Sequence, residues 1–357
     1  MSDLRKADGD NLVAVYERMF DTFYDRTHFV PSIRDWSVVK AVVQAGGHRD
    51  PLVIADFGCG TGRYILPILR YLSGALQHNA LLAVDIAPSV PNRVVKRLRC
   101  TDIPFETMSE YSLKCGNTGV YFFNATESAR SSLKIGFHEY YGRIDVAFSF
   151  LSYLSHLQSY DDRVTELARI AQSLRPGGVV ILTLPNSNQR YVSAQHRVIE
   201  QRRKTADDRT ETGDALINPF HLDASAPEEL TKLFCHAFPL DEVTSLLVDS
   251  GLSVCGHVRA AKRVIGYRHL EPNEAAIARN LADARSCMAI SEHNVEIGAQ
   301  DFLVVAIKPC HAEDTTASRR HKISQLIDRI SEYSIRDAVR VIMWQAAHFN
   351  RQYEDGV

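Results

Sequence analysis

Short, unbroken apolar runs recur along the chain, and stretches with helical spacing separate them. Residues 53–55, 81–84 and 179–182 are such runs, and residues 161–173 carry apolar positions three and four apart. Continuous apolar runs are typical of parallel strands that helices cover on both faces, and the spacing between them is typical of helices. The alternation predicts an α/β fold with a mainly parallel sheet.

The first apolar run leads into a glycine-rich turn. Asp56 follows the run, and Gly58, Gly60 and Gly62 precede a new helical stretch. Glycine lets the backbone turn sharply and lets a ligand approach main-chain N–H groups near the start of a helix. The second run ends in Asp85, where a doubly wound sheet places a carboxylate that accepts hydrogen bonds from two ribose hydroxyls. The two features together predict a nucleotide site.

Two segments resemble motifs of class I S-adenosylmethionine-dependent methyltransferases. They are Asp56-Phe57-Gly58-Cys59-Gly60-Thr61-Gly62 and Leu174-Arg175-Pro176-Gly177-Gly178, which resembles that family's turn from helix to strand. The resemblance implies a Rossmann-like seven-stranded methyltransferase sheet flanked by helices, with S-adenosylmethionine as cofactor. It places Gly58 and Gly60 beside the methionine part, Asp85 at the ribose and Asn124 near the adenine, although Asn124 could simply end a strand. The cofactor-binding residues expected on this basis are Asp56, Gly58, Gly60, Gly62, Asp85, Ile86, Asn124 and Phe150. A Rossmann-like domain that binds another nucleotide is the alternative.

The loop after the expected fourth strand is the expected place for substrate chemistry, because ligands of open α/β sheets bind at the carboxyl ends of the strands. Tyr153 and His156 lie in that loop, and His221 lies in a later segment. A histidine near neutral pKa or a hydrogen-bonded phenol can take a proton from an acceptor. We therefore expect Tyr153, His156 and His221 as candidate catalytic residues. The alternative is that each is a surface or hydrogen-bonding residue.

Charge and cysteine usage narrow the class of protein. The 357 residues carry a formal net charge of −2, whereas proteins that grip a nucleic-acid backbone usually show a basic excess. The seven cysteines are scattered without a C-x-x-C pair, which argues against a zinc site and a disulfide framework. No stretch supplies the roughly 20 apolar residues of a membrane span, and no secretory signal is visible. These features predict a soluble, cytoplasmic protein without a metal.

One elaborated core and two extensions account for the length of the chain. The core is expected over residues 46–309, with substrate-side insertions near 186–240 and 258–300. Residues 310–357 carry apolar positions at helical spacing and predict a C-terminal helical extension. Its apolar face must pack on the protein's own core, on a second copy in a homodimer or over the substrate mouth.

Residues 1–45 precede the first strand, and the apolar spacing within residues 11–45 predicts two helices. In the methyltransferase superfamily such a segment commonly covers the cofactor, so the resemblance implies an N-terminal helical lid. Tyr16, Phe23 or Tyr24 could touch the cofactor. Each of these aromatic residues could equally be a plain core contact.

Further segments resemble one subgroup, the messenger-RNA cap guanine-N7 methyltransferases. Among them are Ile33-Arg34-Asp35-Trp36, Pro185-Asn186-Ser187 and Phe238-Pro239-Leu240. Cap enzymes place a His-Tyr pair after the fourth strand, a glutamate before the Phe-Pro-Leu segment and a tyrosine in the last strand. This chain has Ser152-Tyr153, Leu233 and Phe302 there. A buried guanine would lack its partners in such a pocket.

We therefore expect a methyltransferase that moves a methyl group to an N, O or C atom of a small-molecule acceptor. The first alternative is an RNA cap or nucleotide methyltransferase with an altered pocket. The others are a non-methyl use of the sulfonium cofactor and a non-catalytic module that keeps the fold for partner binding.

Overall fold

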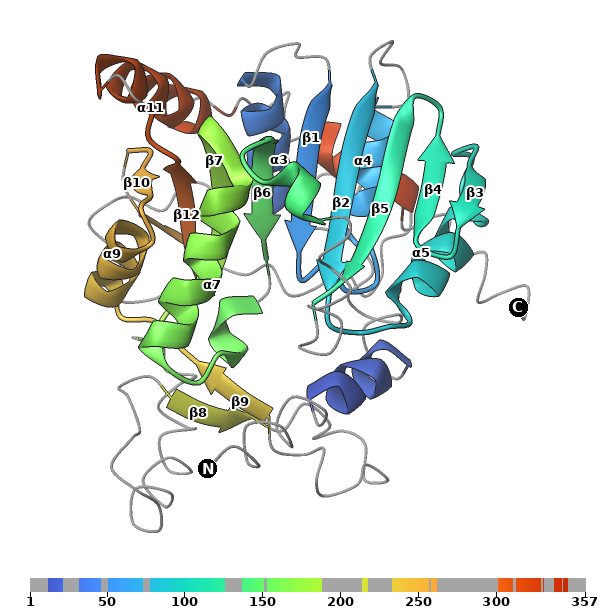
Figure 1. Cartoon of the computed structure of the whole chain (residues 1–357), viewed down its shortest axis with the longest axis horizontal. Coiled ribbons are helices and arrows are strands. Elements are labelled where there is room, and N and C mark those ends of the chain that lie inside the picture. The colour runs from blue at the N-terminus through green and yellow to red at the C-terminus, as the bar shows by residue number, and fades with distance from the viewer. Residues whose placement is uncertain are drawn as a thin grey trace.

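A large central sheet with helices on both faces forms the body of the protein (Figure 1). The computed structural model describes residues 12–21, 32–45, 51–72, 78–125, 137–150, 153–187, 214–217, 233–256, 258–261, 301–310, 313–328, 330, 337–341 and 343–345. Within these residues, no helix combines the length and the apolar character that a membrane crossing needs.

Parallel strands form the middle of the sheet, in the order β7-β6-β1-β2-β5. Their bounds are β1 (Leu52–Phe57), β2 (Asn79–Asp85), β5 (Thr118–Asn124), β6 (Ile144–Ser149) and β7 (Leu174–Pro185). Along β1, Leu52 and Ile54 face one apolar cluster, while Val53 and Ala55 face the other. Both faces of the strand are therefore buried, which is why its sequence is continuously apolar. The predicted parallel α/β sheet is confirmed.

Antiparallel strands extend the sheet at both edges. They are β12 (Asp301–Ile307) on β7, β10 (Ser253–Val254) and β11 (Arg259–Ala261) on β12, and β4 (Ser112–Cys115) and β3 (Glu106–Ser109) beyond β5. The described sheet thus has ten strands, and β3, β4 and β11 come in addition to the expected seven. In β4 only Leu113 and Cys115 are buried, so its sequence lacks the apolar run that marks the central strands.

The expected turn Leu174–Gly178 is the first part of β7 instead. Ile144 pairs with Leu174 but Val146 pairs with Val179, so extra residues of β7 bulge out of the ladder. Gly177 adopts a φ of +74° in this bulge. The glycines therefore serve a bulge within a strand rather than a connection before it.

Helices cover both faces of the sheet. On one face lie α3 (Ile33–Ala45), α4 (Ile65–Leu72), α5 (Val90–Leu98) and α11 (Glu313–Asp328), and on the other lie α7 (Tyr160–Ser173) and α9 (Leu240–Asp249). Figure 1 shows α7 and α9 in front of the strands. Two short 3₁₀ helices, η3 (Phe137–Tyr140) and η4 (Tyr153–His156), flank β6.

The described part of the C-terminal extension packs on the protein's own core. Ile323 and Ile327 of α11, followed by Ala338, Val339 and Met343, are buried in the same apolar cluster as α3. Own-core packing, one of the three expected arrangements, therefore accounts for these side chains. A homodimer stays a prediction.

Two further elements lie at the carboxyl ends of the parallel strands, at the bottom of Figure 1. Helical residues 12–21 lie there, as does the hairpin of β8 (Asp214–Ile217) and β9 (Leu233–His236). This edge is where ligands bind in open α/β sheets.

Candidate active site

A cavity of about 130 Å³ opens at the carboxyl ends of the central strands. The predicted site residues that line it are Asp56, Gly58, Gly60, Asp85, Ile86, Phe150, Tyr153 and His156. Gly62 and Asn124 are not among the lining residues, whereas Ala125, which follows Asn124, is one of them. His221 lies outside the described residues. The chain therefore brings most of the predicted residues to one place.

Two glycines of the turn are required by their neighbours. Gly58 has a φ of +76°, and a Cβ there would lie 2.9 Å from Cδ2 of Tyr153, so the Tyr153 ring covers the turn. Gly62 has a φ of +81°, and its Cβ would lie 2.6 Å from Cγ2 of Val94 in α5. Gly62 thus lets the turn pack on α5, and its predicted cofactor contact stays a prediction. Only glycine tolerates this backbone at these close approaches.

Asp85 braces the glycine turn from the end of β2. Its Oδ2 accepts the N–H of Gly60 at 2.7 Å, and its Oδ1 accepts the N–H of Ala87 at 2.9 Å. Burial raises the pKa of the Asp85 carboxyl to about 6, against the opposite effect of the N–H groups of Ala87 and Gly60. Each carboxylate oxygen has a further lone pair. Asp85 can therefore still accept hydrogen bonds from ribose hydroxyls.

Asp56 holds an unsatisfied acceptor at the cavity. The residue is 2% exposed, and its Oδ2 has no hydrogen-bond partner among the described residues. Burial and the nearby charge of Asp85 raise the pKa of Asp56 well above its usual range, while Arg63 acts in the opposite direction. A buried acceptor without a donor is costly. The site fits a ligand that brings an N–H donor, such as the ammonium of the methionine part of S-adenosylmethionine.

Apolar surface lines the cavity beside these carboxylates. The Phe150 ring stacks on Phe148 with centroids 5.3 Å apart and lies 4.7 Å from the Tyr64 ring. The Tyr64 hydroxyl donates to Oδ2 of Asp35 at 3.1 Å, which fixes the ring from α3. Ile86 adds a further apolar side chain to the lining. These side chains form a rigid wall against which a flat heterocycle could pack.

Tyr153 is tied to a buried ion pair on α7. Its hydroxyl donates to Oε1 of Glu166 at 2.6 Å, and Glu166 also pairs with Arg169, whose Nε lies 2.9 Å from Oε2. Burial and the Glu166 charge raise the pKa of Tyr153 well above its usual range. The phenol therefore stays protonated at neutral pH. Sequence reasoning missed Glu166, which lines the cavity from the middle of a crossover helix.

His156 presents a neutral imidazole to the cavity. Its Nδ1 lies 2.8 Å from the Phe234 carbonyl oxygen of β9. Because a carbonyl only accepts, Nδ1 carries the hydrogen and Nε2 keeps a lone pair. Burial lowers the pKa of His156, against the opposite effect of the bond to Phe234. This arrangement suits a proton acceptor.

Helical residues 12–21 cover the cavity and are called its roof below. Leu12, Tyr16 and Phe20 recur every fourth position and line it from one face of the helix. Tyr16 meets His156 edge-on with centroids 5.6 Å apart. The predicted contacts of Phe23 and Tyr24 lie outside the described residues.

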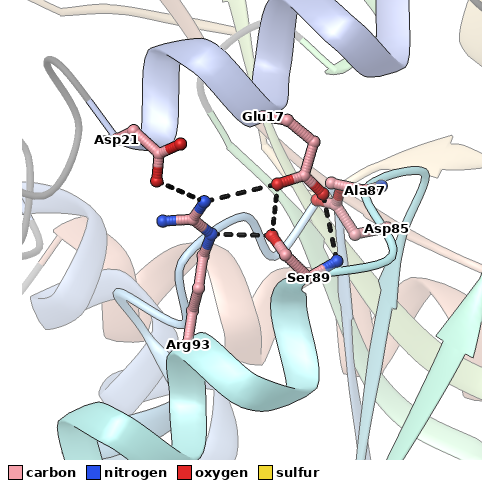
Figure 2. A network of polar contacts seen from close by, with 6 residues as sticks. All are labelled: Glu17, Asp21, Asp85, Ala87, Ser89 and Arg93. Atoms are coloured by element: carbon pink, nitrogen blue, oxygen red, sulfur yellow. Dashed lines mark hydrogen bonds and ion pairs between the residues drawn. The ribbon is translucent and has the colours of Figure 1, made fainter.

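A polar network fastens this roof to the start of α5 (Figure 2). Glu17 accepts the N–H of Ser89 at 3.0 Å and its hydroxyl at 2.5 Å. Nη2 of Arg93 reaches Glu17 at 3.3 Å and Asp21 at 2.7 Å, and Nε of Arg93 donates to the Ser89 hydroxyl at 2.7 Å. The network lies next to Asp85 and Ala87 (Figure 2). Arg93 therefore joins residues 12–21 to the start of α5.

Comparison with known proteins gives a family. A family model described as a methyltransferase domain matches residues 34–254. A solved S-adenosylmethionine-dependent methyltransferase from Methanosarcina mazei is 17% identical, with a TM-score of 0.44, over 74% of this chain and 95% of that one. Another solved structure is the 1,6-didemethyltoxoflavin-N1-methyltransferase of Burkholderia thailandensis with bound 1,6-didemethyltoxoflavin and S-adenosylhomocysteine. It is 16% identical, with a TM-score of 0.43, over 86% of this chain and 90% of that one. No curated protein matches the chain.

The matched span covers more than half of the chain and contains the glycine turn, Asp85 and His156. The finer resemblance to the cap guanine-N7 enzymes gains no support from these comparisons. The chain belongs to the family of methyltransferase domains.

Proposed function

We propose that the protein moves the methyl group of S-adenosylmethionine to an N, O or C atom of a small-molecule acceptor, with His156 as general base. The observation that carries the proposal is the His156 ring, which lines the cavity while the Phe234 carbonyl holds the hydrogen on Nδ1. The bound cofactor supplies an electrophilic methyl group on its sulfonium. The side chains of the cavity bind, orient and take up a proton.

The carboxylates of the cavity would hold the cofactor. Asp56 offers its unpaired Oδ2 to the ammonium group, and Asp85 offers its remaining lone pairs to the ribose hydroxyls. Ile86 and Phe150 supply apolar surface for the adenine. Asn124 stands beside Asp85 in the ladder, and its role at the adenine edge stays a prediction.

His156 suits the role of base better than Tyr153. A hydroxyl or carbon acceptor must lose a proton when its new bond to the methyl carbon forms. The Tyr153 hydroxyl is already a donor to Glu166, and its raised pKa keeps it protonated. Nε2 of His156 has a free lone pair and can take that proton. His221 stays a further candidate.

The surroundings of the cavity favour a small acceptor over a capped RNA. Residues 12–21 roof the cavity closely, since Phe20 would lie 3.6 Å from a Cβ at Gly60. Leu233 and Phe302, which stand where cap enzymes hold guanine, are buried in apolar clusters and are absent from the described lining. A guanine edge would find no partner in either side chain.

Transfer of a labelled methyl group tests the proposal. The protein would be incubated with methyl-labelled S-adenosylmethionine and, in separate reactions, with a fractionated small-molecule extract and with capped RNA. We expect label in a small-molecule product. His156→Gln should slow its formation by roughly 100-fold or more, whereas the exposed control His138→Gln should not. Label that enters RNA alone would overturn the proposed acceptor class. A His156→Gln variant that forms the product as fast as the parent would overturn the role of His156 as general base.

A further inference from the structure

Two contacts fix the position of His156. One is made by its own ring to β9, and the other by the neighbouring residue Leu157 to α7. Its Nδ1 bonds to the Phe234 carbonyl in β9. On the other side, the carbonyl of Leu157, the next residue, accepts a hydrogen bond from Nη1 of Arg163 at 3.1 Å. The ring therefore depends on the spacing between the loop at Leu157 and β9.

One buried guanidinium spans that spacing. Arg163 of α7 is fully buried, and its Nη2 lies 3.1 Å from Oε1 of Glu242 at the start of α9. Oε2 of the same carboxylate lies 2.9 Å from Nε2 of His236, a fully buried residue at the end of β9. Phe238 packs against both partners, with its ring 4.8 Å from His236 and 5.7 Å from the Arg163 guanidinium. A continuous chain of contacts thus leads from Leu157 through Arg163 and Glu242 to β9.

We propose that Arg163 and Glu242 are positioning residues that hold His156 in its proton-accepting tautomer. The inference rests on the proposed function of His156. Nη1 of the planar guanidinium donates to the Leu157 carbonyl while Nη2 forms an ion pair with Glu242, so one side chain bridges both. A buried charge without its partner is costly, which keeps this arrangement in place.

The consequence for His156 follows from hydrogen-bond geometry. The bond between Nδ1 and the Phe234 oxygen weakens once the two atoms separate beyond about 3.2 Å. The bond made by one ring nitrogen decides which nitrogen carries the hydrogen. If β9 drifts from the loop, the hydrogen can therefore move to Nε2, and the base is lost.

Other ionisable groups also surround the ring and bear on its titration. Those on the neighbouring elements and in the shared cavity include Tyr16, Tyr153, Glu166, Cys235, His236, Asp56, Cys59, Tyr64, Asp85 and Arg63. None of them is changed in the variants below. A shift in the titration of His156 in those variants therefore reports on Arg163 and Glu242.

Nitrogen NMR of the histidine side chains tests the inference without an acceptor. The His156 signals would be assigned by their loss in His156→Gln, and the tautomer and titration midpoint then measured in the parent, Glu242→Gln and Arg163→Lys. Asp241→Asn is the matched control, because Asp241 is the exposed acid next to Glu242 in the same helical turn. Circular dichroism would confirm that each variant is folded, and calorimetry would give its affinity for S-adenosylhomocysteine.

We expect the Nδ1–H tautomer in the parent and in Asp241→Asn. In Glu242→Gln and Arg163→Lys we expect a mixture of tautomers and a midpoint that rises toward about 6.5 as the ring becomes hydrated. Affinity for S-adenosylhomocysteine should change by less than about twofold. An unchanged tautomer and midpoint in the folded variants would overturn the inference, as would an Nε2–H tautomer in the parent. A parent that fails to bind S-adenosylhomocysteine would instead overturn the proposed function, while the tautomer result still decides on the positioning role.

Discussion

Replacing Asp85 by asparagine should remove the pH dependence that this carboxyl gives to the stability of the protein without cofactor, and it should weaken cofactor binding. The Asp85 carboxyl is 8% exposed, and burial raises its pKa from 3.8 to about 6. A raised pKa means that the fold tolerates the neutral carboxyl better than the carboxylate. Asparagine stays neutral at every pH of interest, but its amide has a single acceptor oxygen, so only one of the N–H groups of Gly60 and Ala87 keeps its partner.

The size of the effect follows from that shift. A change of about two pKa units corresponds to about 3 kcal/mol at about 1.4 kcal/mol per unit. This is the folding free energy that the parent gives up when Asp85 ionises between low pH and pH 8, and Asp85→Asn has no such loss. For a chain of this size, a loss of about 3 kcal/mol lowers the thermal midpoint by roughly 6 °C.

The dependence on pH has a definite sign. Because the folded pKa lies above the unfolded one, the contribution of Asp85 to stability is complete below about 3.8 and is lost as the pH rises through about 6. The stability of Asp85→Asn relative to the parent should therefore fall by about 3 kcal/mol as the pH falls from 8 toward 4. Cofactor affinity of the parent should fall over the same window, because protonation removes acceptors for the ribose hydroxyls.

Thermal unfolding at pH 8 and pH 5, with and without S-adenosylhomocysteine, measures both effects. Two lost hydrogen bonds to a carboxylate are worth about 3 kcal/mol or more, so the variant should bind roughly 100-fold more weakly. Asp102→Asn, which changes an exposed carboxyl after α5, should alter neither stability nor binding. A stability difference between variant and parent that is the same at pH 8 and pH 5, or a variant that binds as tightly as the parent, would refute this account of Asp85.

Three further predictions concern the roof, the turn and the phenol. Arg93→Ala removes the bonds that hold residues 12–21 to α5, so S-adenosylhomocysteine should dissociate roughly tenfold faster in stopped-flow measurements. The exposed control Lys96→Ala should leave the dissociation rate unchanged. Equal dissociation rates in both variants would contradict the role of residues 12–21. Gly58→Ala forces a Cβ to within 2.9 Å of Tyr153, whereas a Cβ at Gly116, which shares a positive φ, meets nothing within 4 Å. In urea unfolding, Gly58→Ala should therefore lower the free energy of unfolding by about 1 to 3 kcal/mol more than Gly116→Ala. Similar losses in both variants would show that the Tyr153 contact is unimportant. Tyr153→Phe deletes only the hydroxyl bonded to Glu166 and should keep methyl transfer within about tenfold of the parent; a loss of 100-fold or more would restore Tyr153 as a base.

The sequence predicts the central strands well and the sheet edge poorly. Strands β1 and β2 are buried on both faces, so their sequences contain unbroken apolar runs that predict strands. Strand β3 is exposed along its whole length, and β4 buries only alternate residues. A strand of that kind depends on a neighbour to pair with, which no local pattern reveals.

The site shows the same division between local and distant contacts. Asp56, Gly58 and Asp85 could be predicted because a nucleotide turn needs those residue types at short spacing. The Phe234 carbonyl that bonds to His156 comes from 78 residues away in the sequence. Main-chain groups and crossover-helix carboxylates carry no sequence signal for such contacts, so they become visible only once the chain is folded.

A crystal structure with S-adenosylhomocysteine is the most direct test of the central claim. The claim predicts the ligand's ammonium group within about 3 Å of Oδ2 of Asp56 and its ribose hydroxyls within about 3 Å of the Asp85 carboxylate. His156 should face the open space beyond the ligand's sulfur. A ligand bound elsewhere, or one that leaves both carboxylates without a contact, would contradict the account.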